Sequence, residues 1–212
     1  MGTLLVAATA MEIGSLSRTL AAVDTIQTGI GMINTAYVLT KALCRKSYDL
    51  VLNIGVCGSY TDSLKVGTVV EVTQEILGDL GATTADGEFL DLQELGFPLF
   101  EKPSGVVFNT LSNPTRIRDV FPTADFPQVQ GLTLNTTTGD QNRIAHLQRL
   151  FDADIETMEG AAVALVCQRD GIPYLELRAV SNKVEPRNKS HWNIGDAINN
   201  LHVAVGRLFE KR

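Results

Sequence analysis

Short apolar runs alternate along this chain with longer segments in which apolar residues recur at helical spacing. The clearest runs, Leu4–Ala8, Leu50–Ile54 and Tyr174–Val180, have the length of buried strands. The predicted strands are 4–8, 50–54, 67–72, 106–111, 131–136 and 174–180, and the predicted helices are 12–21, 32–45, 160–168 and 193–209. Alternation of this kind predicts an α/β fold.

The apolar spacing also predicts which face of each helix is buried. Residues 160–168 are apolar on nearly every side, so this helix is expected to be fully buried. In the helix 32–45 the expected inner face holds Ile33, Ala36, Tyr37, Thr40 and Leu43. In the helix 193–209 the expected inner stripe holds Ile198, Leu201, Val205, Leu208 and Phe209.

Residues 78–103 interrupt this pattern. The stretch is loop-like and contains several glycines, yet residues 88–100 are rich in Phe and Leu. An apolar segment without helical or strand periodicity is more typical of a lid or a subunit contact than of a linker. We therefore expect residues 88–100 to contact another copy of the chain.

Composition narrows the class of protein. The 212 residues, 44% hydrophobic and 20% charged, suit a single domain spanning 1–212. A net charge of −6 with scattered Lys and Arg argues against a nucleic-acid or anionic-membrane surface. The apolar N-terminal run is too short for a membrane span and no basic segment precedes it. Three separate cysteines and three separate histidines indicate a reduced, cytoplasmic protein without a metal site.

Two acidic residues are candidates for chemistry. Glu12 follows the first strand, where a carboxylate can activate a water molecule, although a glutamate there can also serve only the helix dipole. Glu159 is a lone acid at the start of an apolar helix, and a buried carboxylate needs partners. A structural partner would satisfy it, but two adjacent ribose hydroxyls would do so as well, and we predict that Glu159 binds a ribose.

Three further segments offer ligand contacts. After the strand 50–54, Gly55 and Val56 expose backbone that a ligand can approach, but the glycine spacing does not match a dinucleotide fingerprint. Thr138-Gly139-Asp140 forms a turn whose default role is structural. Asn182 follows the last strand, and its amide can donate to O6 and accept from a protonated N7 of a 6-oxopurine.

Seven motifs in order along the chain carry a family resemblance. They are Ala10-Met11-Glu12, Thr28-Gly29-Ile30-Gly31, Asn53-x-Gly55-x-x-Gly58, Leu64-Lys65-Val66-Gly67-Thr68, Thr138-Gly139-Asp140, Met158-Glu159-Gly160-Ala161-Ala162 and Arg178-Ala179-Val180-Ser181-Asn182. Together they resemble the purine and uridine phosphorylase superfamily, in particular its nucleosidases. The resemblance implies a single α/β domain with a mixed, partly barrel-like central sheet flanked by helices.

The resemblance also implies roles for these residues. Catalysis would involve Glu12, Asn182 and Asp140, with Glu12 or Asp140 activating water. Met158 would pack beneath the sugar that Glu159 binds, and Ser181 would orient Asn182. The remaining predicted substrate-binding residues are Gly55, Val56, Thr138 and Gly139. The implied enzyme binds a small purine nucleoside, needs no cofactor or metal, and forms a dimer-based homo-oligomer.

The late pair distinguishes branches of the superfamily. Adenine-releasing methylthioadenosine/adenosylhomocysteine nucleosidases carry Ser-Asp there, whereas this chain has Ser181-Asn182 followed by Lys183-Val184. That stretch is similar to the one in phosphorylases selective for 6-oxopurines. The best match is the futalosine hydrolases, which release hypoxanthine from futalosine in menaquinone biosynthesis. The alternatives are a methylthioadenosine/adenosylhomocysteine-type or other purine nucleosidase, a purine nucleoside phosphorylase, or a non-catalytic purine-nucleoside binding protein.

Two positions depart from the family pattern. Gly14 stands where related nucleosidases carry a water-activating acid, and Val56 stands where relatives often carry serine. A phosphorylase must also hold a phosphate dianion, for which arginine is well suited. None of the matching segments contains the arginines at positions 18, 45, 116 and 118. This favours water as the attacking group.

Overall fold

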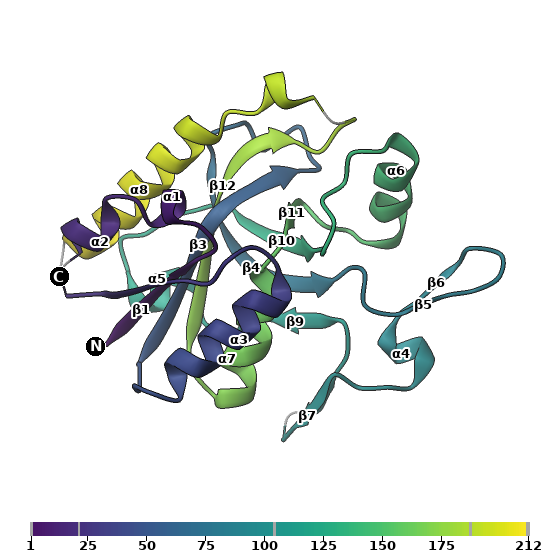
Figure 1. Cartoon of the computed structure of the whole chain (residues 1–212), viewed down its shortest axis with the longest axis horizontal. Helices are drawn as coiled ribbons and strands as arrows, with labels where there is room; N and C mark the ends of the chain where they lie inside the picture. Colours follow the sequence, from purple (N-terminus) through teal and green to yellow (C-terminus); the bar gives the residue numbers. More distant parts are fainter. Residues whose placement is uncertain (1, 21, 104, 187, 211–212) are drawn as a thin grey trace.

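A mixed sheet forms the centre of the computed structural model, which describes residues 2–20, 22–103, 105–186 and 188–210 (Figure 1). The strands are β1 (Thr3–Ala7), β2 (Asp24–Gln27), β3 (Leu50–Ser59), β4 (Val69–Leu77), β5 (Ala82–Thr83), β6 (Phe89–Leu90), β7 (Phe100–Lys102), β8 (Gly105–Val107), β9 (Thr110–Ser112), β10 (Gln128–Thr133), β11 (Ile155–Thr157) and β12 (Tyr174–Lys183). The helices are α1 (Ala10–Ile13), α2 (Leu16–Thr19), α3 (Met32–Leu43), α4 (Leu92–Leu95), α5 (Ile117–Val120), α6 (Gln141–Leu150), α7 (Gly160–Asp170) and α8 (Ile194–Glu210). Lys189–His191 form a 3₁₀ turn.

Part of this sheet closes on itself. The order β11-β10-β4-β12-β3-β1-β2 contains an additional pairing of β11 with β3, in which Glu156 lies opposite Gly58. Strands β3, β12, β4, β10 and β11 therefore form a five-strand barrel, and β1, β2 and β9 extend it. Both parallel and antiparallel pairings occur. The predicted mixed, partly barrel-like sheet is confirmed.

Helices cover the sheet on two sides (Figure 1). The alternating side chains of a strand pack against the helices on both sides. Successive residues of a strand point to opposite faces. In β1, Leu5 packs in a buried cluster with Leu201 of α8. The neighbouring residue Leu4 packs in a second cluster with Leu39 of α3 and Val163 of α7. Neighbouring residues of β1 thus pack into two different buried clusters on opposite faces of the sheet.

Two predicted helices were wrong in detail. The predicted helix 12–21 is broken into α1 and α2 at Gly14, whose φ of 45° favours glycine, while Ala21 lies outside the described residues. In α3 the buried residues are Thr35 and Leu39, whereas Ile33 is 84% exposed and Tyr37 is 65% exposed. Both faces of α3 carry apolar residues, so the spacing alone did not identify the inner one.

The remaining helices follow the sequence pattern. All but four residues of α7 are buried, which confirms its predicted burial. The α8 stripe is confirmed at Leu201, Val205 and Leu208, which are buried. Ile198 and Phe209 are half-buried at its margin.

Several strands differ in extent from the prediction. β3 continues through Gly55 and Gly58, and β12 continues through Ser181 and Asn182. The predicted strand 106–111 is split between β8 and β9. Because the pairing of β3 with β12 extends over these residues, both motifs stand in the barrel wall rather than in loops beyond it.

Residues 78–103 extend away from the sheet as an arm built from β5, β6, α4 and β7 (Figure 1). The arm contacts the body through Phe89, whose ring lies edge-on to Phe151 at 6.0 Å between centroids. Phe97 at its surface is 69% exposed. Within the described residues, no helix has both the length and the apolar character needed to span a membrane.

Candidate active site

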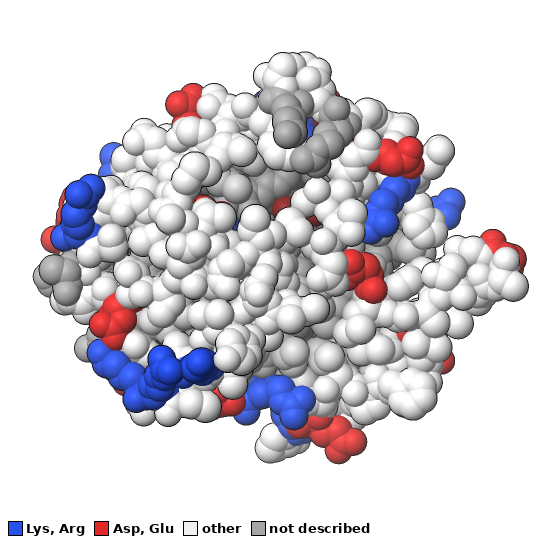
Figure 2. Space-filling view, viewed as in Figure 1, with Lys and Arg blue, Asp and Glu red and all other residues white. Residues whose placement is uncertain are grey.

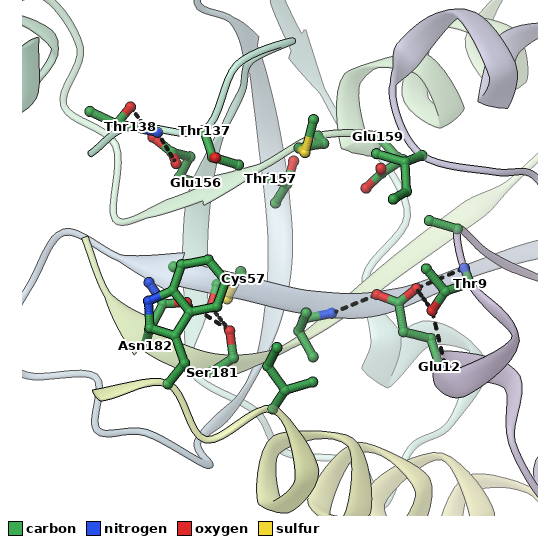
Figure 3. Close-up of a pocket in the computed structure, with 17 residues that line it drawn as sticks. Thr9, Glu12, Cys57, Thr137, Thr138, Glu156, Thr157, Glu159, Ser181 and Asn182 are labelled. Carbon is green, nitrogen blue, oxygen red and sulfur yellow. Dashed lines mark hydrogen bonds between the residues drawn. The ribbon is translucent and has the colours of Figure 1, made fainter. Parts of the chain in front are cut away.

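A pocket of about 280 Å³ opens where β1, β3, β11 and β12 end, and the space-filling view shows a hollow on this face (Figure 2). Seven predicted site residues line it: Glu12, Val56, Thr138, Met158, Glu159, Ser181 and Asn182. They come from segments far apart in the sequence and face one cavity (Figure 3). The structure thus brings most of the predicted site together.

Three predicted residues lie elsewhere. Asp140 is exposed and caps α6, accepting a hydrogen bond from the backbone N–H of Arg143 at 2.9 Å. The structural role considered for its turn is the one observed, so Asp140 is not a candidate for activating water. Gly139 is also outside the pocket lining. Gly55 lies behind the wall, where its missing side chain leaves room for Arg178 and Glu12.

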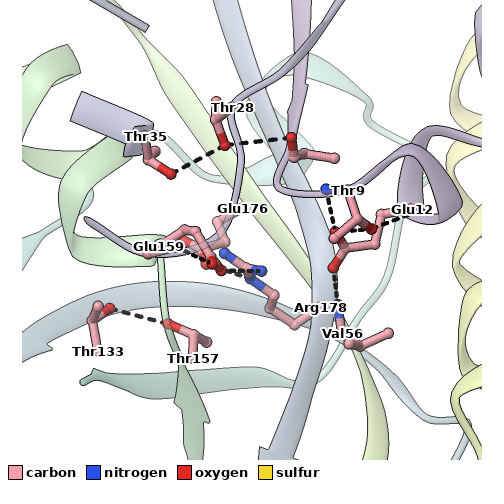
Figure 4. A network of polar contacts seen from close by, with 12 residues as sticks. Thr9, Glu12, Thr28, Thr35, Val56, Thr133, Thr157, Glu159, Glu176 and Arg178 are labelled. Atoms are coloured by element: carbon pink, nitrogen blue, oxygen red, sulfur yellow. Dashed lines mark hydrogen bonds and ion pairs between the residues drawn. The ribbon is translucent and has the colours of Figure 1, made fainter. Parts of the chain in front are cut away.

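Glu12 combines a structural and a pocket position. Its Oε2 accepts hydrogen bonds from the backbone N–H of Thr9 at 2.9 Å and from Thr9 Oγ1 at 2.8 Å, completing a capping box for α1. Its Oε1 accepts from the backbone N–H of Val56 at 3.1 Å (Figure 4). Because Val56 contributes its backbone, a serine side chain is not needed for this contact.

Glu159 is anchored from across the chain. The backbone N–H of Gly31 donates to its Oε1 at 2.9 Å, and Gly31 has a φ of 90° that favours glycine. This contact gives the Thr28-Gly29-Ile30-Gly31 motif a physical purpose. Burial raises the pKa of Glu159, while the Arg178 charge and the Gly31 hydrogen bond oppose that shift. The Gly31 hydrogen bond therefore fixes the carboxylate of Glu159 at the pocket wall.

Sequence reasoning missed Arg178 as a site residue. Its side chain is only 1% exposed, and its Nε donates to Glu176 Oε1 at 2.7 Å. Its Nη1 lies 3.9 Å from Glu159 Oε2 (Figure 4). Burial opposes the charge of Arg178, but Glu176, Glu159 and Glu12 hold its pKa above the usual range. The available signal was a Glu and an Arg two residues apart, on the same face of an apolar strand.

A second buried carboxyl supports this arginine. Burial and the nearby Glu176 raise the pKa of Glu75 well above its usual range. A protonated Glu75 can donate to Glu176, which in turn holds Arg178. A Cβ on Gly160 would lie 2.0 Å from Glu75 Oε1, so this glycine makes room for the carboxyl pair.

Asn182 faces the pocket from β12. Ser181 Oγ lies 2.8 Å from Asn182 Oδ1 and 3.1 Å from the carbonyl of Cys57, positioned to donate to either. Asn182 Nδ2 donates to the carbonyl of Lys183 at 2.9 Å. These contacts fix which amide atom is oxygen and which is nitrogen. The predicted orienting role of Ser181 has the hydrogen bond it requires.

Among the described residues, no group of three or more His, Cys, Asp or Glu side chains is arranged to hold a metal ion. The pocket residues themselves are carboxylates, hydroxyls, an amide and apolar groups. Such a set can bind sugar hydroxyls, hold a water molecule and hydrogen-bond the edge of a base.

Comparison with known proteins identifies the family. A family model described as the phosphorylase superfamily matches residues 11–211. The chain belongs to the phosphorylase superfamily. Two relatives named futalosine hydrolase are similar to this chain over most of its length. The one from Streptomyces coelicolor is 40% identical over 79% of the chain and 68% of its own length. The one from Thermus thermophilus is 32% identical over 86% of the chain and 79% of its own length.

Solved structures agree on the fold. The crystal structure of a 5′-methylthioadenosine/S-adenosylhomocysteine nucleosidase from Helicobacter pylori superposes with a TM-score of 0.81. The match covers 100% of this chain and 99% of that one, at 17% sequence identity. The phosphorylase-superfamily fold therefore extends over the whole described chain.

Proposed function

We propose that this chain hydrolyses the N-glycosidic bond of futalosine and releases hypoxanthine, a step in menaquinone biosynthesis. The observation that carries the proposal is the 40% and 32% identity to proteins named futalosine hydrolase, each over most of the chain. The amide of Asn182 in the pocket supports a 6-oxopurine, because it offers one donor and one acceptor side by side.

The pocket geometry suits a hydrolytic mechanism. Glu159 accepts hydrogen bonds from the ribose hydroxyls, and Met158 packs against the sugar. Glu12 holds the attacking water molecule. As the bond from C1′ to the base breaks, its electron pair leaves with the base and positive charge develops on the sugar. The two carboxylates stabilise that charge. Water adds its hydroxyl to C1′, and its remaining proton ends on the base, which Asn182 binds at O6 and N7.

Charge in the pocket favours water over phosphate as the attacking group. Among the described residues that line the pocket, none is Lys or Arg. The nearby Arg178 is already paired with Glu176 and faces Glu159. A phosphate dianion would therefore meet carboxylates with no uncommitted cation to balance it.

The test is incubation with futalosine, inosine and methylthioadenosine, with and without phosphate, followed by chromatography of the released bases. We expect hypoxanthine from futalosine at a rate independent of phosphate. Adenine released from methylthioadenosine in preference would instead identify an adenine nucleosidase. A requirement for phosphate would identify a phosphorylase, and tight nucleoside binding without product would identify a binding protein.

We also propose that the enzyme is a dimer-based homo-oligomer. Phe97 on the arm, and Ile33 and Tyr37 on α3, are large apolar side chains exposed to solvent. Ile33 and Tyr37 are four residues apart on α3 and therefore share one face of that helix, and exposed apolar surface is typical of subunit contacts. Light scattering coupled to size-exclusion chromatography measures the mass directly, and a monomer at micromolar concentration would contradict this proposal.

The proposal includes a cytoplasmic enzyme that works without a cofactor. Cys44, Cys57 and Cys167 are all unpaired thiols, and the latter two are buried. Unpaired cysteines are typical of reducing compartments. Full activity of protein dialysed against a chelator, and recovery of the protein in the cytoplasmic fraction, would support both statements.

A further inference from the structure

Glu156 has no part in the mechanism described above, yet it lines the same pocket as Asn182. The barrel places the two residues on either side of one glycine. Glu156 of β11 lies opposite Gly58 of β3, and Asn182 of β12 lies opposite Gly58 from the other side. Adjacent strands are about 4.8 Å apart, so the two backbones are separated by roughly two strand spacings. Residues directly opposite one another across a sheet project toward the same face.

Gly58 keeps the space between them open. A Cβ at this position would lie 3.3 Å from Asn182 Nδ2 and 2.8 Å from Val184 Cγ2. The missing side chain of Gly58 therefore points to the side that the Asn182 amide occupies. Figure 3 shows Glu156 and Asn182 on opposite sides of the pocket, with Cys57 beside Ser181 and Asn182. A flat ring seated over the glycine would have one edge toward each residue.

The carboxylate of Glu156 is held firmly as a hydrogen-bond acceptor. The backbone N–H of Thr138 donates to its Oε1 at 2.8 Å. The hydroxyls of Tyr60, at 2.7 Å, and of Thr138 both donate to its Oε2. Burial and the Glu156 carboxylate raise the pKa of Tyr60, so this phenol keeps its proton and remains a donor.

One acceptor position of Glu156 remains for a ligand. A carboxylate offers about four lone-pair sites, and the three donors above occupy three of them. The fourth site is on Oε1, where the backbone N–H of Thr138 is the donor described above. Glu156 is only 6% exposed, so a donor on the ligand would meet this oxygen away from bulk water.

We propose that Glu156 accepts a hydrogen bond from N1–H of a 6-oxopurine whose O6 and N7 are bound by Asn182. In a 6-oxopurine, N1 and N7 flank the oxygen at C6, so residues on opposite walls can reach both edges of that group. Hypoxanthine and guanine carry a proton on N1. Adenine carries a lone pair there, which would face the carboxylate. This inference rests on the proposed release of a 6-oxopurine base.

Binding of free bases tests the inference separately from hydrolysis. Calorimetry would measure hypoxanthine, 1-methylhypoxanthine and adenine with the wild-type protein, Glu156→Gln and Tyr60→Phe. The wild type is expected to prefer hypoxanthine over each of the other bases by ~10²-fold or more, because a site built for a donor rejects ligands that lack it. Glu156→Gln should reduce the preference for hypoxanthine over adenine to within about ten-fold, since the NH₂ group of the glutamine can donate to N1 of adenine.

Tyr60→Phe is the matched control. It removes one donor to Glu156 without removing the carboxylate, so affinities can fall but the preference for hypoxanthine should persist. Equal wild-type affinity for hypoxanthine and 1-methylhypoxanthine would overturn the inference without any variant. An unchanged preference in Glu156→Gln would overturn it as well. Release of hypoxanthine from futalosine, assayed in parallel, separates this inference from the proposed function. If futalosine is hydrolysed but Glu156→Gln leaves the base preference unchanged, only this inference is wrong. Binding that depends on Glu156 without hydrolysis removes only the proposed activity.

Discussion

Replacing Gly55 with alanine adds one methyl group at the point where Arg178 and Glu12 converge. The new Cβ would lie 2.2 Å from Arg178 Nη1 and 2.8 Å from Glu12 Oε1. Ordinary contact begins near 3.4 Å, so the guanidinium must retreat by about 1.2 Å and the carboxylate by about 0.6 Å. Gly55 does not have a positive φ, so the backbone itself accepts alanine. The effect of Gly55→Ala therefore comes from displaced side chains alone.

Both displaced groups are hydrogen-bonded to partners on other parts of the chain or on the neighbouring helix cap. Arg178 is bound to the buried Glu176, and Glu12 is bound to Thr9 and to the backbone of Val56. Overpacking a buried site costs about 1–3 kcal/mol of folding free energy. Misplacing a reacting group by about 1 Å can cost ~10²-fold in rate. We expect Gly55→Ala to fold with a lowered Tm and to lose ~10²-fold in kcat/KM.

The assay follows hypoxanthine release from futalosine by chromatography, together with thermal unfolding of the same preparations. Gly206→Ala is the matched control, because Gly206 lies in α8 with open space around it. This control should keep wild-type activity and gain up to about 1 kcal/mol of stability, since alanine is the better helix former. Activity of Gly55→Ala within about three-fold of wild type, with an unchanged Tm, would refute the proposed close packing around Gly55.

The remaining predictions concern three residues of the pocket. Glu12→Ala should lower kcat far more than it raises KM, because its proposed role is to hold water; turnover within a few-fold of wild type would assign the water to another group. Glu159→Gln should fold and lose ~2–4 kcal/mol of transition-state stabilisation, and near-normal turnover would remove Glu159 from the ribose site. Since burial raises the pKa of Glu159 and its ionised form binds the hydroxyls, kcat/KM should increase with pH through that raised pKa. A flat acidic limb in a pH profile would contradict this. Asn182→Asp should cut hypoxanthine release by ~10²-fold and shift preference toward adenine, and an unchanged product ratio would show that Asn182 does not contact the base.

The sequence identified site residues best where a polar group interrupts an apolar element. Glu159 precedes a helix that is apolar on nearly every side, and Asn182 ends an apolar strand; both line the pocket. Such interruptions are informative because an unpaired buried polar group is costly. Asp140 carried no such signal, since it lies in a polar turn, and the structure uses it to cap α6.

Residues whose importance depends on strand pairing escaped sequence reasoning. Nothing local to Glu156 indicates that it lies opposite Gly58, because the two positions are far apart in the chain and meet only when β11 closes on β3. Arg178 likewise depends on Gly55, 123 positions earlier, for the space it occupies. The prediction of the buried face of α3 was wrong for a related reason. Its apolar residues Ile33 and Tyr37 have helical spacing but do not face the core of this chain.

Closure of the barrel through β11 and β3 has a consequence for how this pocket can change over evolution. Positions 58, 156 and 182, which we propose to surround the base, sit on strands that are hydrogen-bonded on both sides. Their backbones therefore have no free edge along which to shift. A point mutation at one of them alters the hydrogen-bonding pattern offered to the base and leaves the frame in register. Base preference can therefore diverge through single substitutions at these positions. The same rigidity predicts that the amide protons of residues 58 and 156 exchange with solvent only when the whole domain unfolds.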